Sequence, residues 1–253
     1  MRSRLETTLL ACLLLLFSAG CAAPATELPP PRTTYIGVTP AFSDRAYAWL
    51  QGFAPFDPTH ELTLRILPLE AGIEAAQAGE IDFLISASDP PQDWFATPLE
   101  TSAVLIVTPS NARLRDLTLR QLREIYIGQT TDWSELDAGQ GQIQPMMYPE
   151  GDELRTAFEG FVMEGNRFSS NTRLLPDPAS MAQAVAGTPG AIGVIPDYAT
   201  ITELHSLTLA SSTPTERKIS DSRYPLTVTV IAFAPSEPEG LARTWLGWIQ
   251  AEE

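Results

Sequence analysis

The sequence predicts an α/β fold, in which strands and helices alternate along most of the chain. Short β-rich apolar runs are followed by segments whose apolar residues recur every three or four positions, and such alternation is typical of α/β layers with mostly parallel sheets. The 253 residues are 44 % apolar, which is enough to bury a core, and this length corresponds to one or two domains. After residue 32, no repeat and no linker interrupts the pattern.

The first twenty residues have the features of a secretion signal. Arg2 and Arg4 precede an apolar run over residues 9–17, and small residues then lead to Cys21. The run is shorter than the about 20 residues that a membrane span needs, so residues 1–20 are interpreted as a signal peptide outside the fold. The small residues before Cys21 resemble the bacterial lipoprotein box, which implies a lipid on Cys21. A cleaved signal followed by an incidental cysteine is the alternative.

Charge and cysteine content exclude some classes of partner and of chemistry. The chain carries 31 acidic and 16 basic residues, a net charge of −15, which argues against nucleic acid as a partner. Such a surface does not bind an anionic membrane either, so the lipid is the expected anchor to the cell membrane, on its extracytoplasmic side. Residues 21–32 are rich in proline and are expected to form an extended tether. Cys12 lies in the signal, so cysteine catalysis and disulfides are not expected.

In the first half of the folded chain, four strands and two helices are expected. Strands are predicted over residues 33–38, 62–67, 81–85 and 103–107 because these runs are apolar and β-rich. The helix after the first strand is predicted from apolar residues at spacings of three and four, namely Ala46, Trp49, Leu50 and Phe53. A shorter helix is expected over residues 72–78.

In the second half, Thr118 and Gln121 form a capping-box pair that opens a helix ending at Gly128. The apolar face of this helix is formed by Leu119, Leu122 and Ile125. Strands are predicted over residues 143–147, 191–195 and 226–233. Further helices are predicted over residues 151–163, with Leu154, Phe158 and Phe161 packed inward, from Ser180 to Gly187, and around Leu241, Trp245, Trp248 and Ile249.

Residues 117–136, LTLRQLREIYIGQTTDWSEL, resemble a segment of the phosphate-type solute-binding proteins of ABC transporters. The shared pattern is a helix, an aromatic residue, a glycine, a short polar stretch and a tryptophan. Three further segments match this family in the same order, at residues 79–83, 189–194 and 224–226. The resemblance therefore extends over nearly the whole chain after the tether.

The resemblance implies a two-lobed type II periplasmic-binding-protein fold, in which two α/β lobes are joined by two hinge strands. By analogy, lobe one would comprise residues 33–106 and 200–253, and lobe two residues 107–199. Proteins of this family capture a small ligand, phosphate or a related oxoanion, by lobe closure and present it to an ABC permease. The resemblance thus implies a monomeric binding protein that needs no metal or other cofactor.

Two turns after the expected strands carry candidate ligand-binding residues. In open α/β sheets, ligands bind beyond the carboxyl ends of the strands, where helix N-termini direct backbone N–H groups into the crevice. Thr39 and Ser43 follow the first strand, and Ser86 and Ser88 follow the third. Hydroxyl groups both donate and accept hydrogen bonds, which suits the oxygens of an oxoanion. The alternative is that these residues are ordinary helix caps and turn residues.

A third turn is acidic where the resembled family has an anion-binding loop. Gly151, Asp152 and Arg155 are the candidate binding residues here, and the sequence Glu150-Gly151-Asp152-Glu153 places three carboxylates in this turn. A like charge about 4 Å away opposes an anion by about 1 kcal/mol in water and by more when enclosed. Three interpretations stay open. Asp152 could cap the helix while Glu153 satisfies the helix dipole and Arg155 points to solvent; Arg155 could pair with an anion; or a carboxylate could receive a protonated, cationic or polyhydroxylated ligand.

An enzyme and an altered binding fold are the other two classes. The chain has no Gly-x-Ser-x-Gly, His-Glu-x-x-His or Ser-x-x-Lys motif and no phosphate loop ending in Gly-Lys. His60 and His205 are expected at the surface, so catalysis is not expected. The remaining alternative is a lipoprotein that uses the binding fold as a sensor or scaffold, with a lost or altered ligand site.

Overall fold

The computed structural model describes residues 32–53, 60–199, 202–209 and 224–252. The predicted signal peptide, Cys21 and all but the last residue of the predicted tether lie outside these residues. None of the helices in the described ranges is long and apolar enough to cross a membrane.

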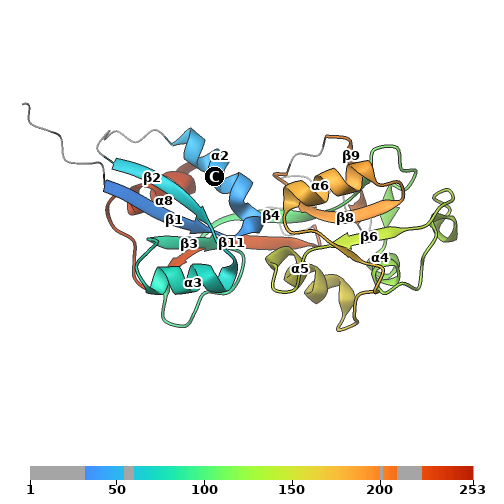
Figure 1. Ribbon diagram of the computed structural model, residues 1–253, viewed down its shortest axis with the longest axis horizontal. Helices are drawn as coiled ribbons and strands as arrows, with labels where there is room; N and C mark the ends of the chain where they lie inside the picture. Colours follow the sequence, from blue (N-terminus) through green and yellow to red (C-terminus); the bar gives the residue numbers. More distant parts are fainter. Residues whose placement is uncertain (1–31, 54–59, 200–201, 210–223, 253) are drawn as a thin grey trace, which may run out of the picture. The chain divides into compact units, whose positions relative to one another are not determined.

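Most of the described strands belong to one nine-stranded sheet, in the order β2-β1-β3-β11-β4-β8-β6-β7, with β9 beside β4 (Figure 1). The strands of this sheet are β1 (Arg32–Val38), β2 (His60–Ile66), β3 (Phe83–Ser86), β4 (Phe95–Pro109), β6 (Gln144–Met147), β7 (Arg173–Leu174), β8 (Ala191–Pro196), β9 (Leu204–Ser206) and β11 (Thr227–Ala234). Two short strands, β5 (Asp116–Leu117) and β10 (Thr208–Leu209), pair with each other.

The helices pack against the two ends of this sheet. Those near β1 to β3 are η1 (Pro40–Phe42), α2 (Ser43–Gly52), α3 (Leu69–Gln77) and α8 (Gly240–Glu252). Those of the middle of the chain, which lie around β6 and β8 in Figure 1, are α4 (Leu119–Tyr126), η2 (Trp133–Leu136), α5 (Glu153–Phe158), the π-helical turn η3 (Glu159–Met163) and α6 (Pro178–Gly187).

The sheet is mixed, which corrects the expectation of a mostly parallel one. β1 is parallel to β2 and β3, and β6 is parallel to β7 and β8. β11, which comes from the end of the chain, lies between β3 and β4 and is antiparallel to both. Local periodicity predicts a strand but not its direction, because direction is set by pairing with a partner far away in the sequence.

The long strand β4 changes its partner along its length. Its residues up to Ala103 pair with β11, whereas Val104 to Val107 pair with β8, and its end pairs with β9. The sequence predicts only the second part, residues 103–107, because the first part is polar and contains Pro98. The division of the chain into lobes at residues 106 and 199 stays a prediction.

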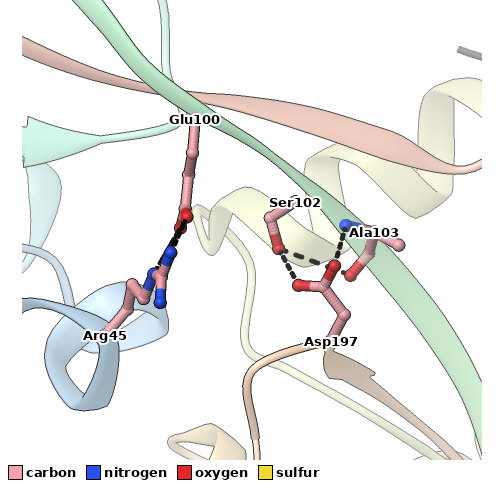
Figure 2. A network of polar contacts seen from close by, with 5 residues as sticks. All are labelled: Arg45, Glu100, Ser102, Ala103 and Asp197. Atoms are coloured by element: carbon pink, nitrogen blue, oxygen red, sulfur yellow. Dashed lines mark hydrogen bonds and ion pairs between the residues drawn. The ribbon is translucent and has the colours of Figure 1, made fainter. Parts of the chain in front are cut away.

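Polar contacts hold β4 where its pairing changes (Figure 2). The carboxylate of Asp197, directly after β8, accepts hydrogen bonds from Ser102 Oγ at 2.7 Å and from the backbone N–H of Ala103 at 3.1 Å. On the same strand, Glu100 accepts two bonds from Nε of Arg45 on α2, the shorter at 2.9 Å. Bonds to charged groups are stronger than neutral ones, so this crossing point is firmly joined to α2 and to the end of β8.

The capping box predicted for α4 is confirmed. Thr118 Oγ1 accepts from the backbone N–H of Gln121 at 3.2 Å, and Gln121 Oε1 accepts from the N–H of Thr118 at 2.9 Å. Gly128, two residues past the end of α4, has a φ of 80°, which glycine adopts without a steric penalty.

The helix predicted over residues 151–163 is interrupted. Leu154 and Phe158 are buried as expected, but the expectation for Phe161 is wrong because its side chain is 51 % exposed. The chain turns from α-helix to π-helix at Glu159, and the extra residue in this turn rotates the following side chains about the axis. Val162 and Met163 are therefore buried in place of Phe161.

Two of the segments that resemble the phosphate-type family contact each other. The indole Nε1 of Trp133 donates to the backbone oxygen of Gly190 at 3.2 Å. The same oxygen accepts from the N–H of Gln144, the first residue of β6, at 3.0 Å. The tryptophan of this pattern thus supports the packing of β6 and β8.

Candidate functional site

The candidate site lies where the ends of β1 and β3 meet the N-terminus of α5. Thr39 directly follows β1, Ser86 ends β3, and Glu153 is the first residue of α5. All three side chains are buried, with Ser86 at 0 % and Glu153 at 6 % exposure. The parallel pairing of β1 with β3 brings Thr39 and Ser86 to the same edge of the sheet.

The carboxylate of Glu153 accepts three hydrogen bonds from this edge. Thr39 Oγ1 donates to Oε2 at 2.7 Å, whereas Oε1 accepts from Ser86 Oγ and from the backbone N–H of Ala87, the latter at 3.1 Å. Ser86 Oγ in turn accepts from the N–H of Ser88 at 2.9 Å. We call the three donors of Thr39, Ser86 and Ala87 the donor cradle.

Burial raises the pKa of Glu153 to about 7. The hydrogen bonds from Ser86, Thr39 and Ala87 lower the pKa, and the neighbouring charge of Asp152 raises it further. In the described part of the chain, the groups that shift this pKa include no cation. The donor cradle thus favours the charged form of Glu153 by neutral donors alone, and burial outweighs this effect.

Asp152 is the N-cap of α5. Its Oδ1 accepts from the backbone N–H groups of Leu154 at 2.9 Å and Arg155 at 3.1 Å. Burial raises the pKa of Asp152 to about 6, and these two bonds and the charge of Arg155 oppose the rise. Asp152 therefore has the capping role of the first interpretation. Glu153 does not fit that interpretation, because the Glu153 side chain reaches across to β1 and β3.

Arg155 does not reach the donor cradle. Its Nε donates to Glu159 Oε1 at 2.8 Å, one helical turn further on, and its Nη1 donates to the backbone oxygen of Tyr148 at 3.2 Å. The guanidinium lies 4.9 Å from the ring centre of Phe168. Arg155 has no contact with the donor cradle and does not point freely to solvent, because Glu159 and Phe168 hold its guanidinium.

The other predicted site residues have local roles. Ser43 Oγ donates to the backbone oxygen of Pro40 at 3.0 Å, within the turn that opens α2. Ser88 contributes its backbone N–H to Ser86. Gly151 is exposed and has a φ of 86°, so it allows the turn before Asp152.

Sequence reasoning missed three contributors: Glu153 as an occupant, the N–H of Ala87, and Tyr198. The hydroxyl of Tyr198, in the turn after β8, donates to the backbone oxygen of Ala41 in η1. Burial, with a contribution from the charge of Glu153 among others, raises the pKa of Tyr198 well above its usual value. No sequence pattern points to Ala87 or Tyr198. The acidic turn that contains Glu153 is evident in the sequence, but the donors that its carboxylate contacts are not.

Three cavities of about 760, 490 and 630 Å³ are lined by residues outside the donor cradle. The third lies beside α5 and is lined by residues that include Glu150, Arg155, Glu159 and Phe168.

Residues 36–253 match the family model of the PBP superfamily domain. The chain belongs to the PBP superfamily. The match includes the donor cradle, α5 and the whole described sheet except the first residues of β1.

Similarity to individual PBP proteins points to phosphate-type members. The phosphate-binding protein PstS of Bacillus subtilis (strain 168) is 24 % identical over 151 residues, which cover 56 % of this chain and 48 % of that protein. A phosphate ABC transporter substrate-binding protein from Clostridium perfringens, solved with bound phosphate, has a TM-score of 0.79 at 19 % identity. The superposition covers 86 % of this chain and 93 % of the Clostridium chain. An ABC-type phosphate transport receptor from Vibrio cholerae has a TM-score of 0.69 at 16 % identity, covering 87 % and 94 %.

These similarities confirm the predicted resemblance to phosphate-type solute-binding proteins and the two-lobed α/β periplasmic-binding-protein fold. The aligned part spans about half of the length of the Bacillus relative. At these identities the solved structures establish the fold, and the ligand is a separate question.

Proposed function

We propose that this PBP superfamily protein is an extracytoplasmic solute-binding protein that captures phosphate or a related oxoanion for an ABC permease. The donor cradle carries the proposal. Two hydroxyls and one backbone N–H converge on the oxygens of a carboxylate, and such donors equally suit the oxygens of a tetrahedral oxoanion. The relatives described above as phosphate-binding support the same class of ligand.

Lobe closure is the proposed mechanism of capture. With lobe one formed by residues 33–106 and 200–253 and lobe two by 107–199, the contacts from Thr39 to Glu153 and from Ala41 to Tyr198 would connect the lobes. A ligand that touches both sides shifts the population toward the closed form, because it gains contacts there that the open form lacks. Such binding involves no bond cleavage, and the protein acts as a carrier with no catalytic residue.

The test is a thermal-shift panel on the purified chain with phosphate, sulfate, molybdate, nucleotides, sugars and metal ions. Phosphate or a related oxoanion should raise the melting temperature. At a ligand concentration a hundredfold above Kd, the native state gains about 2.7 kcal/mol. If the chain melts cooperatively and no oxoanion shifts the melting temperature, the proposed ligand class is wrong.

A sensor or scaffold is the second candidate, and the position of Glu153 favours it. The carboxylate that fills the donor cradle belongs to the chain itself, and Asp152 adds a second negative charge nearby. A protein whose donors are permanently satisfied by its own side chain has no need of an external anion. A gene neighbourhood that lacks a permease and an ATPase, together with a flat oxoanion panel, would support this candidate.

A further inference from the structure

We propose that Glu153 is an intramolecular ligand of the donor cradle, which an external oxoanion must displace, so that Glu153 sets the anion affinity of the site. The part of this inference that concerns an external anion rests on the proposed function. The internal contact itself does not.

The contacts of Glu153 follow the pattern expected of a bound oxoanion. Its two oxygens are used separately, Oε2 by Thr39 on the β1 side and Oε1 by Ser86 and Ala87 on the β3 side. The donors come from residues 114, 67 and 66 positions away in the chain, so the carboxylate is seated by tertiary structure. At 6 % exposure it is enclosed as a ligand in a closed cleft would be.

The local structure of α5 leaves Glu153 free for this role. Asp152 satisfies the backbone N–H groups of Leu154 and Arg155, so the helix needs no cap from Glu153. Its first-turn position would favour a carboxylate on the helix surface through the helix dipole. The observed side chain is instead buried against another element, where burial opposes the charged form.

Internal and external anions exclude each other for two reasons. Each hydroxyl and each backbone N–H has one proton to donate, and all three donors of the cradle are directed at Glu153. An oxoanion entering beside Glu153 would also meet the charge of Asp152, while Arg155 is engaged by Glu159. Binding therefore requires that Glu153 leaves the cradle.

The size of the effect follows from the population of the self-occupied state. If Glu153 fills the cradle in about 90 % of the molecules, the apparent Kd for an external anion is about tenfold weaker than that of the vacant cradle. Removing the carboxylate should recover this factor.

The first experiment is calorimetric titration of the full chain with inorganic phosphate. Glu153→Ala should bind phosphate at least about tenfold more tightly than the wild type. Glu153→Gln, which keeps the size and removes the charge, should change in the same direction and serves if the alanine variant does not fold. Adding Thr39→Val to Glu153→Ala should abolish the gain, because it removes a cradle donor.

The matched control is Glu150→Ala, which removes an exposed carboxylate from the same turn. It should leave phosphate affinity within about twofold of the wild type, since screened exposed charges contribute little. An equal gain in Glu150→Ala and Glu153→Ala would mean that only net charge matters and would overturn the inference. Equal affinity of the wild type and Glu153→Ala would overturn the inference alone. Absence of phosphate binding in every folded variant would overturn both the competition and the proposed function.

A second experiment tests the internal contact without any ligand. In a double-mutant cycle, the effects of Thr39→Val and Glu153→Gln on the free energy of unfolding should be clearly non-additive, because the two side chains share one buried hydrogen bond. Additive effects would show that Glu153 does not occupy the donor cradle in solution, independently of the phosphate titrations.

Discussion

The carboxyl groups of Asp152 and Glu153 are adjacent in sequence and both lie in surroundings that disfavour their charge. Asp152 is held by two backbone N–H groups of its own helix, and Glu153 by donors from β1 and β3. Burial raises the pKa of Glu153 from the usual 4.5 to about 7 and that of Asp152 from 3.8 to about 6. Because the folded state holds these protons more tightly than the unfolded chain, the contribution of these two groups to stability is greatest at low pH and falls as pH rises.

The pH dependence of stability can be predicted from this sign. The contribution of Glu153 to the free energy of unfolding should decrease by about 3 kcal/mol as the pH rises from about 4 to about 8. Glu153→Gln should remove most of that share and leave the smaller contribution of Asp152. The groups that face Glu153 are Asp152 on its own turn, the hydroxyls of Thr39 and Ser86, and Tyr198 after β8, none of which supplies a positive charge.

Urea denaturation of the two proteins at pH 5, 6, 7 and 8 measures this prediction. The difference between wild type and Glu153→Gln isolates Glu153 from other titrating groups such as His205. A difference that is constant over this range would contradict the raised pKa. Glu150→Gln provides the control, because its side chain is exposed and should leave the pH profile unchanged.

A helix or strand is predicted correctly when the residues that define it lie within a short window of sequence. The capping box of α4 and the apolar strands β1 and β8 lie within short windows of sequence, and the structure confirms them. The first part of β4 has no such local signal. Pro98 and Glu100 are unusual in a strand, and their pairing depends on β11. The register of β11 shifts between Val230 and Ile231, opposite the segment that contains Pro98, which lacks the N–H of a regular ladder.

The turn between α6 and β8 offers a prediction at this scale. Gly190 has a φ of 78°, and a Cβ there would lie 2.3 Å from the backbone oxygen of Gln142. Gly190→Ala should therefore reduce the free energy of unfolding by at least about 2 kcal/mol, through backbone strain and a clash with an atom that cannot rotate away. The contacts of the Gly190 oxygen with Trp133 and Gln144 would be disturbed as well.

Gly247→Ala in α8 is the matched control. A Cβ at Gly247 has no neighbour within 4 Å, and alanine favours a helix interior by about 0.5–1 kcal/mol. This substitution should be neutral or stabilising in the same chemical denaturation experiment. Equal destabilisation by both substitutions would contradict the role assigned to Gly190.

For the whole molecule, the family and the fold follow from comparison with known proteins, whereas the membrane anchor is predicted from the sequence. Membership in the PBP superfamily rests on the match over residues 36–253 and the two-lobed fold on related structures. The lipid on Cys21 is a prediction from residues that the structure does not describe. It matters for the function because a chain of net charge −15 has no electrostatic attraction to an anionic bilayer.

Mass spectrometry of protein extracted from membranes of the native host tests the anchor. The mass should exceed that of the chain beginning at Cys21 by the acyl and glyceryl groups, and Cys21→Ser should release the protein from the membrane fraction. A bare mass would support a cleaved signal with an incidental cysteine.

The α/β class, the order of most elements and the family can all be predicted from the sequence, because periodicity, caps and motifs act over short windows. It also placed Thr39 and Ser86 at strand ends, where ligands bind in such folds. The partner of these hydroxyls, the Glu153 carboxylate, becomes visible only in the folded chain. Glu153 is distant from both in the chain, and whether a carboxylate is buried against neutral donors or exposed at a helix start depends on how the sheet edge and α5 pack together.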